Sequence, residues 1–293
     1  MGSDIFFANS VAQDLNNVFD NIQNIERQMA TGVAVNQPSD NPAAWGEAQI
    51  LAVDQSALSN DGTLAGNALN RLEAAGSALQ QASQALDQAI SVATEGSNGT
   101  LSATDTSSLA TTAQGLLAQI VNAANFQYDG VSEFAGTASG TPAYNSSGDY
   151  QGNSGSNAVT FSDGTSVTLA FDGTQAFGDA ASNTGAMGAL SALVAALNSG
   201  SPSTVAGTLP QLQSALTLLS NFTAAVGGSQ QLLQSVQTQA SATNTQLQSS
   251  ESTLVDANLA ADATALSLAQ LQQEALTSLA SSIGKSSLVN VLA

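Results

Sequence analysis

The chain has 293 residues and a net charge of −19, because 22 acidic side chains stand against three basic ones. It contains no histidine and no cysteine, which excludes metal sites built on those residues, a Ser-His-Asp triad, a thiol nucleophile and disulfide bonds. The three cations, Arg27, Arg71 and Lys285, are too few to neutralise a run of phosphates. We therefore expect no nucleic-acid partner and no binding to an anionic membrane surface.

The apolar part of the sequence consists mostly of Ala, Leu and Val, diluted by Gln, Ser, Thr and Asn. Ala and Leu favour helices, and the aromatic content of 4% indicates thin helix contacts rather than one bulky core. An uncharged polar surface is unusual for a free monomer and suits a chain that packs against identical copies. No apolar run approaches the length of a membrane span, and residues 1–7 lack the basic start of a secretory signal. We expect no membrane insertion and no cleaved signal peptide.

Apolar residues in the first segment recur alternately every three and four residues, from Leu15 to Met29. This is the spacing of a coiled-coil seam. The predicted helix stops at Thr31-Gly32, because glycine favours the left-handed conformation that ends helices. Residues 38–42, which contain two prolines, predict a turn before the next helix.

The same spacing predicts five more helices, and the longest seam keeps its register across a Gly-Gly pair at 227–228. The last predicted helix ends near Gly284. These five helices cover residues 58–96, 109–123, 186–198, 209–254 and 268–283.

Between about Asp129 and Gly185 the helical spacing is absent, and the sequence is rich in Gly, Ser, Asn, Thr and Asp. Short alternating runs at 158–161 and 166–171 flank Asp163-Gly164, which predicts a β-hairpin. The predicted fold is mainly α, a long antiparallel coiled-coil-like rod built from both chain ends with a small β-rich outer module inserted. The predicted domains are terminal helices (1–40 and 256–293), a helical rod (41–130 and 201–255) and the outer module (131–200).

Possible chemical sites have simpler explanations. The carboxylate pairs Glu47/Asp54 and Asp256/Asp262 read as solvated helix faces rather than acid–base partners. The Asp-Gly steps match no calcium-loop spacing, and the glycines at 96–99 lack the lysine of a phosphate loop. We predict a protein that is not an enzyme and has no cofactor or metal site.

Segments near both ends of the chain resemble the bacterial flagellin family. The resemblance covers roughly residues 5–135 and 205–293, and its motifs occur in the family's order. They are 28–36 (QMATGVAVN), 39–44 (SDNPAA), 98–102 (NGTLS), 125–131 (NFQYDGV), 255–264 (VDANLAADAT) and 287–292 (SLVNVL).

The resemblance implies a structural subunit of the flagellar filament that self-assembles through its terminal helices and supports swimming motility. It also implies an extracellular location in the flagellum, reached by type III export. The implied partners are identical subunits, hook-associated proteins, an export chaperone and the export apparatus. The alternative is the related hook–filament junction protein, which the segments 38–42 (PSDNP) and 133–136 (EFAG) favour. Ile90 stands where many family members carry the arginine used by animal innate receptors, so we expect no receptor activation.

Two sets of residues follow from the seams. The first set should pack between neighbouring subunits, and the second should hold the rod together. The assembly set is Leu15, Val18, Ile22, Ile25, Met29, Leu271, Leu276, Leu279 and Ile283, and the rod set is Leu72, Leu79, Leu86, Leu216, Leu219, Leu233 and Leu247.

A third function would be glycan binding by an aromatic platform in the outer module. The only candidate rings are Tyr144, Tyr150, Phe161, Phe171 and Phe177. We predict instead that these rings form the small core of that module.

Overall fold

The computed structural model describes the backbone of residues 2–138 and 140–292. Side chains are described for residues 6 and 9–282, apart from 139. The helices are α1 (Gly2–Thr31), α2 (Pro42–Gly96), α3 (Ala103–Ala124), α4 (Gly173–Phe177), α5 (Gly185–Ser199), α6 (Pro202–Val255) and α7 (Leu259–Leu292). The strands are β1 (Gln127–Tyr128), β2 (Val131–Ser132), β3 (Asn157–Thr160) and β4 (Ser166–Ala170). The prediction of a mainly α fold with a small β-rich insertion is confirmed.

The described residues form two compact units. The terminal unit contains residues 2–57 and 243–292, which include α1, α7 and one end each of α2 and α6. The middle unit contains residues 58–242.

Glycine acts as a helix stop at some positions and not at others. Gly32 follows α1 with φ +73°, as expected for a left-handed helix end. By contrast, α6 continues through Gly227-Gly228, and α7 continues past Gly284 to Leu292. The predicted end of the last helix near Gly284 is therefore wrong. A single glycine within a helix costs only about 1 kcal/mol relative to alanine, which helix-forming neighbours can offset.

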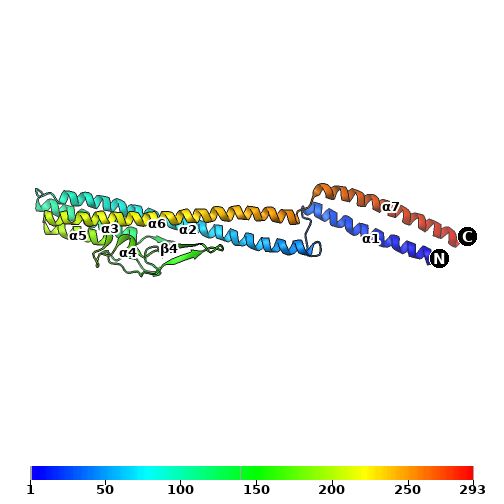
Figure 1. Cartoon of the computed structure of the whole chain (residues 1–293), viewed down its shortest axis with the longest axis horizontal. Helices are drawn as coiled ribbons and strands as arrows, with labels where there is room; N and C mark the ends of the chain where they lie inside the picture. The colour runs from blue at the N-terminus through cyan, green and yellow to red at the C-terminus, as the bar shows by residue number, and fades with distance from the viewer. Residues whose placement is uncertain (1, 139, 293) are drawn as a thin grey trace. The chain divides into compact units, whose positions relative to one another are not determined.

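In the middle unit, α2 and α6 run antiparallel. The side-chain amide of Gln237 lies against Gly66 and that of Gln230 against Gly76, and Figure 1 shows the two helices side by side. Five of the predicted rod leucines in this unit are fully buried: Leu72, Leu79, Leu86, Leu219 and Leu233. A sixth, Leu216, is half-buried. Leu247 belongs to the terminal unit and is half-buried there.

Two hairpins form the β-rich part of the middle unit. The β1–β2 turn uses Asp129 and Gly130, both with positive φ, as a tight two-residue hairpin requires. The β3–β4 hairpin pairs Val159 with Val167 and turns through Asp163-Gly164, as predicted. Ser162 at its tip donates from both its backbone N–H and its hydroxyl to the carboxylate of Asp61 on α2, which fixes the hairpin to the helix.

Aromatic rings form the core beneath these hairpins, as predicted. Phe134 and Phe177 meet edge to face with ring centres 5.0 Å apart, and the Tyr144 ring lies 5.2 Å from that of Tyr150. Burial raises the pKa of both tyrosines, that of Tyr150 to about 12. The buried Tyr144 hydroxyl donates to the carbonyl of Gly178 at 2.8 Å. Rings engaged in this way do not offer a platform for a sugar.

Candidate assembly surface

Helices α1 and α7 of the terminal unit pack against each other along their length (Figure 1). They are antiparallel, because the end of α1 lies beside the start of α7. There the loops bridge directly: Ala34 N–H donates to the carbonyl of Val255 at 2.6 Å, and Ala257 N–H donates to the carbonyl of Gly32 at 2.9 Å. Val33 and Asp256 thereby form a one-residue antiparallel bridge.

The α1 row predicted from the sequence lies on the inner side of this pair. Ile22 and Ile25 are buried, and Leu15, Val18 and Met29 are half-buried. Val11 extends the row by one turn and is buried as well. In the single chain, α7 already covers this seam.

Helix α7 carries two rows of residues on different faces. The inner row is buried or half-buried and includes Ala269 and Leu276. The outer row, in which residues recur every three or four positions, is exposed: Leu268 is 57% exposed, Leu271 62% and Leu279 40%, with Ala275 between them. The predicted assembly residues Leu271 and Leu279 thus face solvent in the single chain. The side chain of the remaining predicted residue, Ile283, lies outside the described residues.

A second exposed row lies on the start of α2, and sequence reasoning missed it. Ile50 and Val53 are 64% and 67% exposed. The exposed Ala43 and Gly46 and the half-buried Ala57 continue the row at the same spacing. The opposite side of α2 packs inward through Ala44 and Ala48. The heptad spacing of residues 43, 50 and 57 was a signal that could have found this row.

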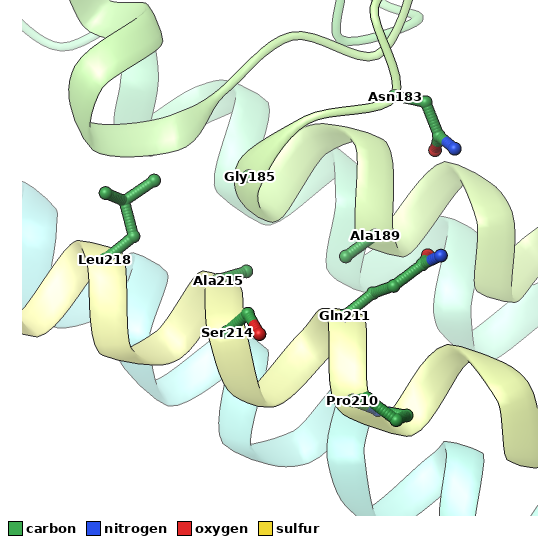
Figure 2. Close-up of a pocket in the computed structure, with 8 residues that line it drawn as sticks. All are labelled: Asn183, Gly185, Ala189, Pro210, Gln211, Ser214, Ala215 and Leu218. Atoms are coloured by element: carbon green, nitrogen blue, oxygen red, sulfur yellow. The ribbon is translucent and has the colours of Figure 1, made fainter.

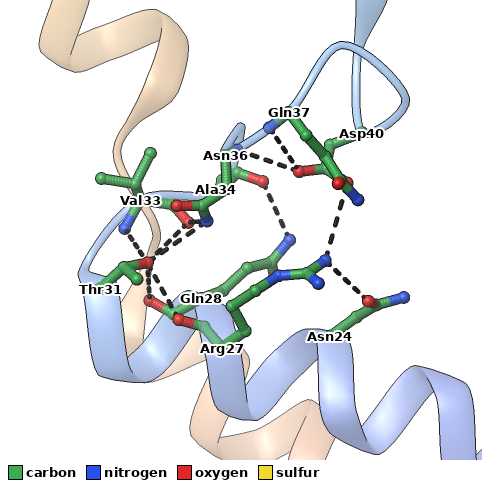
Figure 3. Close-up of polar contacts among 9 residues, drawn as sticks. All are labelled: Asn24, Arg27, Gln28, Thr31, Val33, Ala34, Asn36, Gln37 and Asp40. Atoms are coloured by element: carbon green, nitrogen blue, oxygen red, sulfur yellow. Dashed lines mark hydrogen bonds and ion pairs between the residues drawn. The ribbon is translucent and has the colours of Figure 1, made fainter.

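The loop between α1 and α2 is held by a polar network (Figure 3). Asp40 accepts hydrogen bonds from the backbone N–H groups of Asn36 and Gln37, at 3.0 and 3.1 Å, and from the Gln37 side chain at 3.2 Å. Its carboxylate also lies 3.8 Å from the guanidinium of Arg27. Partial desolvation opposes ionisation of this group, but the three hydrogen bonds and Arg27 outweigh it and lower the pKa of Asp40. The network gives the segment between the two helices a defined path.

The surface cavities are small, and their lining residues do not form a recognisable catalytic or metal-binding group. One of about 320 Å³ lies between α5 and α6, beside Pro210, Ser214 and Asn183 (Figure 2). Another of about 320 Å³ lies between α2 and the hairpins, lined by Leu64, Arg71 and other residues. Among the described residues, no cluster of acidic side chains is arranged to hold a metal ion. Likewise, no helix in the described part of the chain has the length and apolar character to cross a membrane.

Comparisons with known proteins identify the relatives of the chain. Residues 3–139 match the family described as "Bacterial flagellin N-terminal helical region". The flagellar hook-associated protein 3 of Escherichia coli K12 is 41% identical over 99 residues, which are 33% of this chain and 31% of that protein. The same-named protein of Salmonella typhimurium LT2 is 32% identical over 159 residues, 53% of this chain and 50% of that protein. The chain thus spans about a third to a half of the length of these curated relatives.

Solved structures share the fold. A flagellar hook-associated protein from Vibrio parahaemolyticus superposes with a TM-score of 0.67 at 22% identity, covering 73% of this chain and 99% of that one. The flagellar junction protein FlgL from Legionella pneumophila gives 0.55 at 14% identity, covering 73% of this chain and 100% of that one. The architecture is therefore that of the flagellar hook-associated proteins. Through its N-terminal helical region, the chain is similar to the bacterial flagellin family.

Proposed function

We propose that this chain is a junction protein of the bacterial flagellum, joining the hook to the filament as a hook-associated protein. The named relatives support this assignment over the filament-subunit interpretation, because both curated matches are hook-associated protein 3. The turn 38–42 and the segment 133–136, which favoured the junction protein on sequence grounds, agree with them. The proposed role is structural, with no reaction catalysed.

The observation that carries the proposal is the exposed outer row of α7. Leu268, Leu271 and Leu279 face solvent from one side of a helix whose other side is already packed on α1. Burial of apolar surface contributes roughly 25 cal/mol per Å², so covering this row with another molecule is favourable. A monomer gains nothing from keeping such a row in water, whereas an assembling subunit needs it.

The assembly residues predicted from the sequence as one set then take two different roles in the proposal. Helices α1 and α7 act as one pair, held together by Leu15, Val18, Ile22, Ile25, Met29 and Leu276. The outer row, with Leu271 and Leu279 at its centre, contacts the neighbouring copy or the next flagellar component. Ile283 continues the assembly set on sequence grounds.

The predicted domains fit the same scheme. The terminal helices (1–40 and 256–293) would form the inner part of the assembly, the rod (41–130 and 201–255) would lie outside it, and residues 131–200 would form the outer module. The proposed partners are identical copies, other hook-associated proteins, an export chaperone and the flagellar export apparatus. The proposed location is extracellular, in the flagellum, reached by type III export.

The proposal is tested by removing the outer row without touching the α1–α7 contact. The variant Leu271→Ser/Leu279→Ser should fold normally and fail to restore swimming in a strain that lacks the gene. The matched control is Leu218→Ser/Leu232→Ser, because these α6 leucines are 40% and 42% exposed and lie in the middle unit. Restored swimming with the α7 variant, or failure with both, would count against the outer row as the assembly surface.

The place of the protein in the flagellum is tested separately by gold-labelled antibodies and electron microscopy. Label confined to the boundary between hook and filament is the expected result. Label along the whole filament would overturn the junction assignment and support a filament subunit instead.

A further inference from the structure

The loop between α2 and α3 contains the only Asn-Gly step in the sequence, Asn98-Gly99. Both residues are exposed. The loop is short: Asn98 N–H donates to the carbonyl of Glu95 at 3.0 Å, and Leu101 N–H donates to the carbonyl of Asn98 at 3.3 Å. The junction role proposed above does not use this loop.

The side-chain carbonyl of Asn98 is held by two donors. Its Oδ1 accepts from the backbone N–H of Thr100 at 3.2 Å and from the Thr100 hydroxyl at 2.9 Å. Donors placed on a carbonyl oxygen stabilise the negative charge that develops there when a nucleophile adds to the carbon. Asn98 Cγ is therefore an activated electrophile.

The nucleophile is the next backbone nitrogen. Within the described part of the chain, the N–H of Gly99 makes no hydrogen bond, and neither does the amide nitrogen Nδ2 of Asn98. Gly99 has no side chain to crowd the approach of its nitrogen to Asn98 Cγ. The nucleophile (Gly99 N) and the leaving group (Asn98 Nδ2) thus make no hydrogen bond in the described part of the chain, while the carbonyl at Asn98 Cγ is polarised by two donors.

We propose that Asn98 is a site of spontaneous deamidation. The reaction changes this residue, in the loop between α2 and α3, to aspartate or isoaspartate during the life of the protein. Gly99 N loses its proton to solvent and attacks Asn98 Cγ, so that the N–Cγ bond forms. The Cγ–Nδ2 bond then breaks, and Nδ2 leaves as ammonia with a proton from solvent. One water opens the resulting five-membered imide at either carbonyl and gives aspartate or isoaspartate at position 98. Water is consumed, ammonia is released, and nothing is oxidised or reduced.

Either product changes the loop. Each adds one negative charge at position 98, and isoaspartate also adds a methylene to the main chain inside the turn that Leu101 closes. The exposed tip therefore differs between newly made and aged molecules.

Two other loop asparagines serve as internal controls. The Oδ1 of Asn153 accepts three hydrogen bonds, from Thr137 N–H, the Thr137 hydroxyl and Gly155 N–H, each at 3.0 Å, but serine follows it. Asn145 is also followed by serine, and its Nδ2 donates to Asp149 at 2.9 Å. Asn153 thus has a side-chain carbonyl polarised like that of Asn98, but no glycine follows it. In Asn145 the leaving group, Nδ2, is held by a hydrogen bond to Asp149.

The test is to incubate the full chain in warm, mildly alkaline buffer and follow each asparagine by peptide mass spectrometry. Conversion of the amide to the acid at Asn98 should be at least about tenfold faster than at Asn145 or Asn153, a difference of about 1.4 kcal/mol in barrier. Chromatography should resolve aspartate and isoaspartate forms of the peptide. Equal rates at the three positions would overturn the proposal.

Two variants separate the contributions. Gly99→Ala keeps an allowed backbone, and its added Cβ meets no atom within 4 Å beyond its two chain neighbours. The variant should therefore fold normally and slow the conversion about tenfold by crowding the attacking nitrogen. Thr100→Ala removes one donor to Oδ1 and should slow it severalfold. An unchanged rate in Gly99→Ala would overturn the site, and an unchanged rate in Thr100→Ala would overturn the role of the donors. Circular dichroism before incubation verifies that both variants are folded.

Discussion

The Nε–H of Arg71 on α2 donates to both carboxylate oxygens of Glu133, at 2.6 and 2.7 Å, although the two residues are 62 positions apart. The Glu133 side chain is completely buried, whereas that of Arg71 is 18% exposed. Backbone bonds fix the acid in place, because Glu133 N–H donates to Phe126 and its carbonyl accepts from Phe171. One of the three basic residues of the chain thus anchors the β-rich part of the middle unit to its long helix.

Replacing Arg71 by methionine should destabilise the middle unit by about 3–5 kcal/mol at neutral pH, because it leaves Glu133 buried without its cation. Urea unfolding followed by circular dichroism measures the loss. The double variant Arg71→Met/Glu133→Leu should recover most of it, since both charges are then gone. Equal losses in the single and double variants would show that packing, not the ion pair, matters here.

The same variant should show a characteristic pH dependence. Burial raises the pKa of Glu133, and Arg71 opposes that rise, so the pKa should be higher still without Arg71. A carboxyl group whose pKa is raised on folding binds more protons in the native state, so the free energy of unfolding increases as pH falls through the folded pKa. The deficit of Arg71→Met relative to the unchanged protein should therefore shrink as pH falls towards the ordinary value of 4.5. A deficit that grows on acidification would contradict this account.

Asp40 should behave in the opposite way. Partial desolvation opposes its ionisation, but hydrogen bonds from Gln37 and Asn36, with Arg27 nearby, lower the pKa of its carboxyl. Its stabilising effect is therefore complete above the unfolded pKa and is lost as pH falls through the lower folded value.

The amide resonances of Asn36 and Gln37 report this titration by NMR. Their midpoint should lie below about 3.9, the ordinary value for aspartate, and the transition should vanish in Asp40→Asn. A midpoint at or above that value would mean that the loop network does not persist in solution.

Two glycines that both have positive φ should respond very differently to alanine. Gly178 has φ +74°, and an added Cβ would lie 2.1 Å from the carbonyl oxygen of Thr184. Gly164 has φ +84° and open space around it. Gly164→Ala should cost only the backbone strain of about 1–2 kcal/mol, and Gly178→Ala about 3–5 kcal/mol because the overlap with backbone is added. Thermal unfolding of the two variants measures the difference, and similar losses would refute the close approach.

Amide hydrogen exchange should distinguish the two units in the dilute, unassembled chain. The α1–α7 pair buries only a narrow row, and isolated helices with few tertiary contacts are marginally stable in water. We expect α1 and α7 to exchange much faster than the middle part of α2, where Leu72, Leu79 and Leu86 are fully buried. Full protection of both chain ends in the monomer would show that they need no neighbour to fold.

Much of the local structure could be predicted because it depends on nearby residues. The stop at Thr31-Gly32 and the hairpin at Asp163-Gly164 follow from the backbone freedom of glycine, and the structure has both. The extension of α7 past Gly284 could not be predicted from that rule, because the cost of one helical glycine is small beside the preferences of its neighbours.

The sequence by itself determined where apolar residues recur at helical spacing, and so which residues share a face, because that depends only on the periodicity of the helix. Only the tertiary structure decided which faces are covered. It placed Ile22 and Ile25 against α7, left Leu271 and Leu279 in solvent, and brought Arg71 to Glu133. A one-dimensional pattern has the same form whether its partner is the same chain, a second copy or water, and only packing in three dimensions separates these cases.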